Sequence, residues 1–237
     1  MTGRPSVRYS AVRRGRVGGA SAVAVVMLAL VPVPCSAQAP KAGGAPPAAA
    51  APAAAPIPAA APGDVAGVTH VCSSCHGPAG RSVSSTFPRL AGQQKDYLEA
   101  QLKAFRDKTR ADPHAKTYMW GMAARLSDPL IAGIADYYSR QTPVAGTPGN
   151  SPEAAAGARI YTEGIAAESV PACKACHGDH AEGNSVIPRL AGQHRAYIER
   201  QLEAFASNAR ANQVMHDNSK GLSAEEIRDV AAFVQTQ

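Results

Sequence analysis

The chain has 237 residues, with 24 lysines and arginines against 18 aspartates and glutamates, and a formal net charge of +6. Five of the arginines lie within residues 1–39, which contain no acidic residue, so the rest of the chain carries 19 basic and 18 acidic residues. The positive charge is therefore a property of the N-terminal segment. Aromatic residues make up only 5% of the chain, no basic patch is interleaved with them, and this composition argues against a nucleic-acid partner.

The N-terminal segment, residues 1–39, has the three parts that are typical of a secretory signal peptide. An arginine-rich start is followed by the apolar run 20–33 and then by the small residues Ala37 and Ala39. The apolar run is shorter than the roughly 20 residues that a transmembrane helix needs. We expect cleavage after Ala39, removal of Cys35 with the leader, export of the protein, and no membrane span in the mature chain. An uncleaved anchor is the alternative.

Residues 40–63 consist almost entirely of alanine, proline and glycine. Such a stretch lacks the side chains that could form a core. Its seven prolines also oppose a continuous alanine-rich helix, because proline lacks the backbone N–H that the helix uses. We interpret this low-complexity segment as a flexible, partly polyproline tether.

A Cys-x-x-Cys-His pentapeptide then occurs twice, and the second copy starts 101 residues after the first. The copies are Cys72-Ser73-Ser74-Cys75-His76 and Cys173-Lys174-Ala175-Cys176-His177. This motif is typical of covalently attached haem c, where the two thiols add to the vinyl groups and the histidine binds the iron. A thioredoxin-type pair does not need the histidine, and a zinc site needs four clustered ligands. The sequence therefore predicts two covalently bound haem c groups, with His76 and His177 as the proximal iron ligands.

The motif belongs to a longer internal repeat. The stretch 87–93 matches 187–193, and 97–105 matches 197–205, in the same order. This pattern predicts a tandem duplication with domains at 64–142 and 152–237, joined by the proline- and glycine-rich linker 143–151. About 80 residues form only a small core, so we expect each domain to depend on its haem for apolar packing surface.

The repeat reads as helical throughout. Residues 94–107 place apolar side chains at helical spacing, and residues 152–163 form a second such segment. Ser127 can cap a helix that follows it, and the sequence from Ser223 to Glu226 has the pattern of a capping box. No run alternates like a strand, so we predict an all-α fold.

The second axial ligand of each iron decides the chemistry. Methionine raises the reduction potential and closes the iron to substrates. Met119 and Met215 each lie seven residues before a matched leucine, in the loop between the long helix and the C-terminal helix of their domain. We predict these two methionines as the distal ligands. Met122 and His216 are the local alternatives, and simple core packing is the general one.

The remaining histidines are His70, His114, His180 and His194. None has a histidine at the matching place in the other repeat. We expect all four to be solvated or hydrogen-bonded surface residues.

A proline follows each proximal histidine at nearly equal spacing: Pro88 comes 12 residues after His76, and Pro188 comes 11 after His177. A ligating histidine usually donates its other ring N–H to a nearby acceptor, which fixes the orientation of the ring.

Together, the Cys-x-x-Cys-His, the Pro-x-Leu about twelve residues later and the late methionine resemble the class I cytochrome c fold. In that fold the proline carbonyl accepts the histidine N–H, a role that the resemblance assigns to Pro88 and Pro188. The tandem arrangement and the repeated Pro-Arg-Leu-Ala-Gly-Gln resemble the dihaem cytochrome c4 family. The resemblance implies two tandem class I domains, each wrapped around one haem, with the two His/Met haems facing each other. It also implies a periplasmic electron carrier of Gram-negative bacteria.

Three functions are compatible with this pattern. The first is a carrier between quinol–cytochrome c reductase and a terminal oxidase, and the second is the cytochrome subunit of a sulfide- or alcohol-oxidising dehydrogenase. The third is a dihaem peroxidase, which needs an open iron with acid–base groups beside it. Two well-placed methionines argue against that enzyme, so we expect no catalysis by the chain alone.

Overall fold

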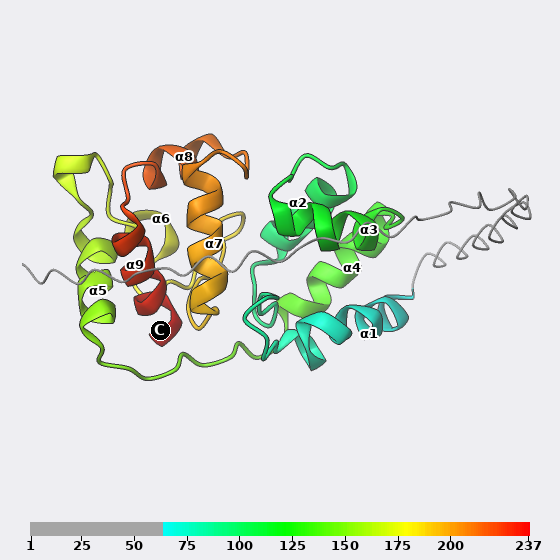
Figure 1. The fold of residues 1–237 in the computed structure, drawn as a ribbon. Coiled ribbons are helices and arrows are strands. Elements are labelled where there is room, and N and C mark those ends of the chain that lie inside the picture. The colour runs from blue at the N-terminus through cyan, green and yellow to red at the C-terminus, as the bar shows by residue number, and fades with distance from the viewer. Residues whose placement is uncertain (1–63) are drawn as a thin grey trace, which may run out of the picture. The chain divides into compact units, whose positions relative to one another are not determined.

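The computed structural model describes residues 64–237, which lie within one compact unit. The predicted signal peptide and the segment 40–63 lie outside the described residues. Figure 1 shows that the described part is built from helices, and its only β-structure is two isolated bridges, Ile165 with Val170 and Asn184 with Ile187. The all-α prediction is confirmed. Within this part, no helix is both long and apolar enough to cross a membrane.

The first half contains four α-helices and one π-helical turn. These are α1 (Val65–His76), α2 (Lys95–Arg106), the π-helical turn Ala115–Met119, α3 (Trp120–Ala123) and α4 (Asp128–Ser139). The core forms where α2 packs against α4, around Leu98, Ile134 and Tyr138. The helix predicted at 94–107 is confirmed as α2. Ser127 does stand at the N-cap of α4, but its side chain makes no capping hydrogen bond.

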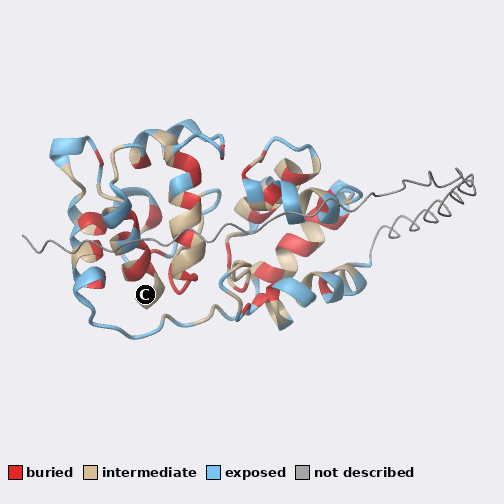
Figure 2. Ribbon diagram, viewed as in Figure 1, coloured by how far each residue is buried: buried red, intermediate tan, exposed pale blue. Residues whose placement is uncertain are grey.

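The second half repeats this plan with five helices. They are α5 (Pro152–Glu163), α6 (Lys174–His177), α7 (Arg195–Ala206), α8 (Gln213–Ser219) and α9 (Ala224–Thr236). The helix predicted at 152–163 is confirmed as α5. The core of this half lies where α5 and α7 pack on α9, around Tyr161, Ile198 and Val234. Figure 2 shows the buried residues running along these inward faces.

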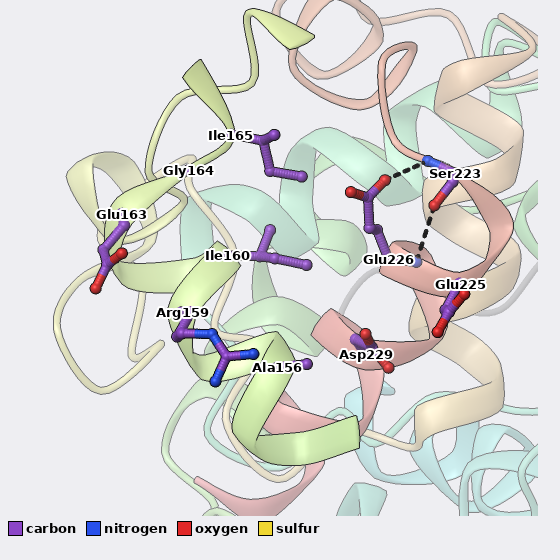
Figure 3. A pocket seen from close by; sticks show the side chains of 10 residues that line it. All are labelled: Ala156, Arg159, Ile160, Glu163, Gly164, Ile165, Ser223, Glu225, Glu226 and Asp229. Atoms are coloured by element: carbon purple, nitrogen blue, oxygen red, sulfur yellow. Dashed lines mark hydrogen bonds between the residues drawn. The ribbon is translucent and has the colours of Figure 1, made fainter. Parts of the chain in front are cut away.

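The start of α9 has the predicted capping box. The Ser223 N–H donates to the Glu226 carboxylate at 2.7 Å, and the Glu226 N–H donates to the Ser223 hydroxyl at 3.3 Å (Figure 3). These bonds satisfy backbone donors that the first helical turn leaves unpaired. Gly157 of α5 lies against the backbone of Asp229 in α9, where any Cβ would collide with the Asp229 carbonyl. A side chain there would force apart the two helices that form the core of this half.

Matching loops hold each haem motif against the rest of its half. The Leu90 N–H donates to Gly80 O at 2.8 Å in the first half, and Leu190 N–H donates to Ala181 O at 2.8 Å in the second. The described residues between α4 and α5 contain no helix. The exact boundaries at 64–142, 143–151 and 152–237 stay a prediction.

Candidate haem sites

The first motif forms the C-terminal end of α1, which places Cys72, Cys75 and His76 within the last five residues of the helix. Both cysteines are free thiols, with Cys75 exposed and Cys72 partly covered. His76 is only 7% exposed, and its Nδ1 donates to the Pro88 carbonyl at 2.9 Å. Because Nδ1 carries the proton in this bond, Nε2 is left with a lone pair for a metal.

Electrostatics favour the ligating form of this histidine. Burial lowers the pKa of His76, and the bond to Pro88 offsets that effect only in part. The imidazole is therefore neutral at physiological pH, as an iron ligand must be. Burial also raises the pKa of the Cys72 thiol, which keeps it protonated.

The second motif repeats this arrangement at α6. The Nδ1 of His177 donates to the Pro188 carbonyl at 3.1 Å, and burial lowers the pKa of His177. Burial raises the pKa of Cys173 to about 11, whereas Cys176 is exposed. Each half thus presents two free thiols beside a buried neutral imidazole, a donor set that fits covalent haem c. Residues 64–237 contain no cluster of three or more His, Cys, Asp or Glu side chains suited to a metal ion.

The predicted distal ligands both lie after the long helix of their half. Met119 ends the π-helical turn and is partly buried, packing near Phe105 and Ala123, whereas Met122 is 48% exposed. Met215 lies in α8 and is also partly buried.

His216, the local alternative to Met215, is hydrogen-bonded to the backbone of the long helix. Its Nδ1 donates to the Phe205 carbonyl at the end of α7, over 2.9 Å. At the matching place in the first half, Trp120 donates its ring N–H to the Arg110 carbonyl at 2.8 Å. Both rings therefore attach the methionine segment to the backbone at or just after the end of the long helix. This segment was predicted as a loop but is helical in both halves.

Both halves match the cytochrome c family, over residues 60–139 and 154–237. Cytochrome c-552 of Acidithiobacillus ferridurans is 40% identical, and the match covers 71% of this chain and 74% of that one. Cytochrome c4 of Azotobacter vinelandii is 35% identical over 73% of this chain and 89% of the relative. The chain belongs to the cytochrome c4 family. The solved cytochrome c4 of Acidithiobacillus ferrooxidans superposes with a TM-score of 0.68 at 38% identity, covering 71% of this chain and 99% of that chain.

Membership of the cytochrome c4 family confirms two tandem class I domains, two covalently bound haem c groups and a role in electron transfer. A further relative is named a thiosulfate dehydrogenase electron acceptor, from Thiomonas intermedia (strain K12). It is 35% identical over 70% of this chain and 78% of the relative.

The expectation that His194 lies at the surface is wrong. His194 is 8% exposed, and its Nε2 donates to the carbonyl of Ser82 in the other half at 2.9 Å. Burial, followed by the nearby charges of Arg89 and Arg200, lowers its pKa. The physical reason is that the start of α7 packs against a loop more than 100 residues away, which local sequence does not reveal.

A buried polar cluster between the halves was also missed. Arg110 donates to Gln101 and, across the interface, to Gln201, in both cases at 2.8 Å. Arg210 mirrors this, donating to Gln201 at 2.6 Å and to Gln101 at 2.7 Å. Asp112 is the one carboxylate bonded to either guanidinium among the described residues, at 2.9 Å from Arg110 Nε. The repeated Tyr-x-x-x-Gln at 97–101 and 197–201 was the available signal, since it puts polar groups on an otherwise apolar helix face.

Tyr97 completes this cluster. Its hydroxyl lies 3.0 Å from Arg210 of the other half. Burial alone would raise the pKa of Tyr97, but the charges of Arg210 and Arg110 outweigh it and lower the pKa.

A hollow between α5 and α9 is separate from the haem motifs (Figure 3). Its charged lining consists of Arg159, Glu163, Glu225, Glu226 and Asp229. No cysteine, proximal histidine or candidate methionine lines it. Burial and then the charges of Glu225 and Glu153 raise the pKa of Asp229 there.

Proposed function

We propose that the chain is a periplasmic carrier of single electrons from a quinol-oxidising complex toward a terminal oxidase. The observation that carries the proposal is the pair of matched proximal sites, in which His76 and His177 are buried and held by a proline carbonyl. Each haem c, when bound, supplies a one-electron iron couple. The protein's part is to hold the imidazole neutral and oriented in both halves, which is what the two histidine–proline bonds do.

The proposed axial ligands are His76 with Met119 and His177 with Met215. A methionine thioether raises the potential and fills the position that peroxide or another small substrate would need. Two irons closed by these methionines would suit a carrier rather than a catalyst. Covalent attachment is assigned to Cys72 and Cys75 in the first half, and to Cys173 and Cys176 in the second.

A second candidate function is the electron-accepting subunit of a periplasmic dehydrogenase. The Thiomonas intermedia relative, named as the electron acceptor of a thiosulfate dehydrogenase, favours this role. The same two haem sites would serve in either role, and only the electron donor would differ.

The test is a pair of assays on the purified holoprotein. Stopped-flow mixing should show fast reduction by a quinol-oxidising complex and fast reoxidation by a terminal oxidase. Steady-state assays with peroxide, sulfide, thiosulfate and alcohols should show negligible turnover by the chain alone. Turnover with any of these substrates would overturn the carrier proposal, and fast reduction only by a co-purifying dehydrogenase would favour the second candidate.

The periplasmic location rests on the predicted leader. Intact-mass measurement and N-terminal sequencing of the exported protein should find a chain that starts after Ala39. Retention of Arg13 in the mature protein would contradict it.

A further inference from the structure

One peptide group joins the proximal histidine of the first half to a side chain of the second half. The carbonyl of Pro88 accepts the His76 Nδ1–H at 2.9 Å. The N–H of the same peptide group belongs to Arg89, and it donates to the Gln193 side-chain oxygen at 2.9 Å. A continuous hydrogen-bonded path therefore runs from the imidazole, through one peptide group, into the other half.

The opposite path has the same form. The carbonyl of Pro188 accepts the His177 Nδ1–H at 3.1 Å, and the N–H of Arg189 donates to the Gln93 side-chain oxygen at 2.7 Å. Each glutamine also returns its amide N–H to the arginine carbonyl, at 2.9 Å for Gln93 and 3.0 Å for Gln193. The arrangement is reciprocal, as in an interface related by a two-fold axis.

These glutamines are buried, because Gln93 is 7% and Gln193 is 5% exposed. A hydrogen bond accepted from a peptide N–H polarises the peptide group and makes its carbonyl oxygen a better acceptor. Such cooperative strengthening is larger where water is excluded. A better acceptor draws the Nδ1 proton more strongly, so the imidazole becomes a more electron-rich ligand. An electron-rich ligand favours ferric iron and lowers the reduction potential.

We propose that Gln193 and Gln93 are positioning residues that tune the reduction potential of the haem in the opposite half, Gln193 through His76 and Gln93 through His177. The proposal rests on the assignment of these histidines as proximal ligands. It means that docking of the two halves lowers both potentials, each through the other half's glutamine.

If the glutamines only hold the two halves together, a different result is expected. Removing one then loosens a shared interface and disturbs both haems together, or the haem of its own half first. The tuning role requires the effect to appear at the haem across the interface.

The experiment uses the full holoprotein with Gln193→Leu and Gln93→Leu. Leucine fills similar space and removes both hydrogen bonds to the opposite half, together with the one that each glutamine oxygen accepts from the N–H of the next residue. A spectroelectrochemical titration, with the two haems resolved by the NMR signals of their methyl groups, gives each potential. We expect Gln193→Leu to raise the potential of the first-half haem and Gln93→Leu that of the second-half haem. The Nδ1–H resonance of the opposite histidine should move upfield as its bond weakens.

The matched control is Ser185→Ala. It removes a 2.7 Å interface hydrogen bond to Asp96 without touching either peptide group, and it should leave both potentials unchanged. If the leucine variants fail to assemble, Gln193→Glu and Gln93→Glu decide, because a carboxylate still accepts from the arginine N–H. Those variants should lower the potential of the opposite haem more than that of the haem in the glutamine's own half.

Unchanged potentials, equal shifts at both haems, or a larger shift at the haem of the glutamine's own half would each overturn the inference. If wild type shows two histidine-ligated haems in any of these cases, the proposed function stands and only the tuning fails. If wild type lacks histidine ligation, both fail.

Discussion

The two halves share the proximal histidine site and most of the polar side chains that join them, but they differ at a few interface positions and in net charge. In both halves, the proximal histidine donates to a proline carbonyl. In both, a glutamine side chain accepts a hydrogen bond from a backbone N–H of the opposite half. At the interface, Asp112 corresponds to Asn212 and Gln94 to His194. The first half, 64–142, carries 10 basic and 7 acidic residues, whereas the second, 152–237, carries 8 and 11. The duplicated haem site is thus nearly symmetric, while its electrostatic surroundings are not.

The largest expected effect concerns the distal ligands. Met119→Ala should abolish the Fe–S charge-transfer band of one haem at the red end of the spectrum. It should also lower that haem's potential, because the thioether that favours ferrous iron is lost. Met215→Ala should do the same at the other haem. Met122→Ala is the control, and loss of the band there instead of at Met119 would reverse the first-half assignment. The measurement is the visible spectrum of each oxidised variant.

Asp112 should carry the next largest effect, because it is buried and paired with Arg110. Asp112→Asn leaves two buried guanidiniums without a carboxylate, and we expect it to destabilise the holoprotein by about 3 kcal/mol. Denaturant unfolding measures this. The reciprocal change, Asn212→Asp, is at an exposed position and should change the free energy of unfolding only slightly. Equal effects of the two variants would show that the asymmetry between the halves has no energetic role.

The same carboxylate should make stability depend on pH. Burial would raise the pKa of Asp112, but the charge and hydrogen bond of Arg110 outweigh it, so the folded-state pKa is lowered. Its contribution is therefore present above the unfolded pKa of about 3.9 and is lost as pH falls below it toward the folded value. Unfolding of wild type and Asp112→Asn between about pH 5 and pH 2 should show the difference between them shrinking. A constant difference would contradict this linkage.

His194 should give a smaller effect at milder pH. Its folded-state pKa is lowered, so the unfolded state binds the proton more readily. The contribution of His194 to stability is then fully present above the unfolded pKa of about 6.5 and declines as pH falls below it. His194→Gln, which installs the residue found at the matching position 94, should remove this part of the pH dependence. Persistence of the full decline in that variant would exclude His194 as its source.

The smallest effect is expected from salt. The halves have formal net charges of +3 and −3, so steering by one tends to offset steering by the other. Rates of exchange with charged redox reagents should change by less than about tenfold between low and physiological ionic strength. Stopped-flow series with an anionic and a cationic reagent test this. A much steeper dependence would indicate one dominant charged docking face.

Local features were predictable from the sequence, and long-range contacts were not. The motifs around Cys72 and Cys173, the helix α2 and the capping box at Ser223 depend on residues within a few positions of each other. The bonds from Arg110 to Gln201 and from His194 to Ser82 join residues about 100 positions apart. Local sequence does not distinguish His194 from a solvated histidine, and at Gln201 the only local signal is a polar residue on an otherwise apolar helix face.

The methionine segment shows the same limit on a smaller scale. The first half has four more residues than the second between its buried arginine and its candidate methionine, and it forms a π-helical turn there. The second half forms the helix α8 instead, capped by the side chain of Asn212. The spacing from methionine to leucine predicted where these ligands lie, but the helix type depends on how the extra residues pack.

The most direct test of the central claim is a visible-spectrum redox titration of the purified holoprotein. Two closed His/Met haems should give two one-electron steps, both from low-spin haem, with a methionine–iron charge-transfer band in the oxidised protein and no carbon monoxide binding to the reduced one. A single step, a high-spin component or carbon monoxide binding would contradict two closed His/Met haems and, with them, the carrier function.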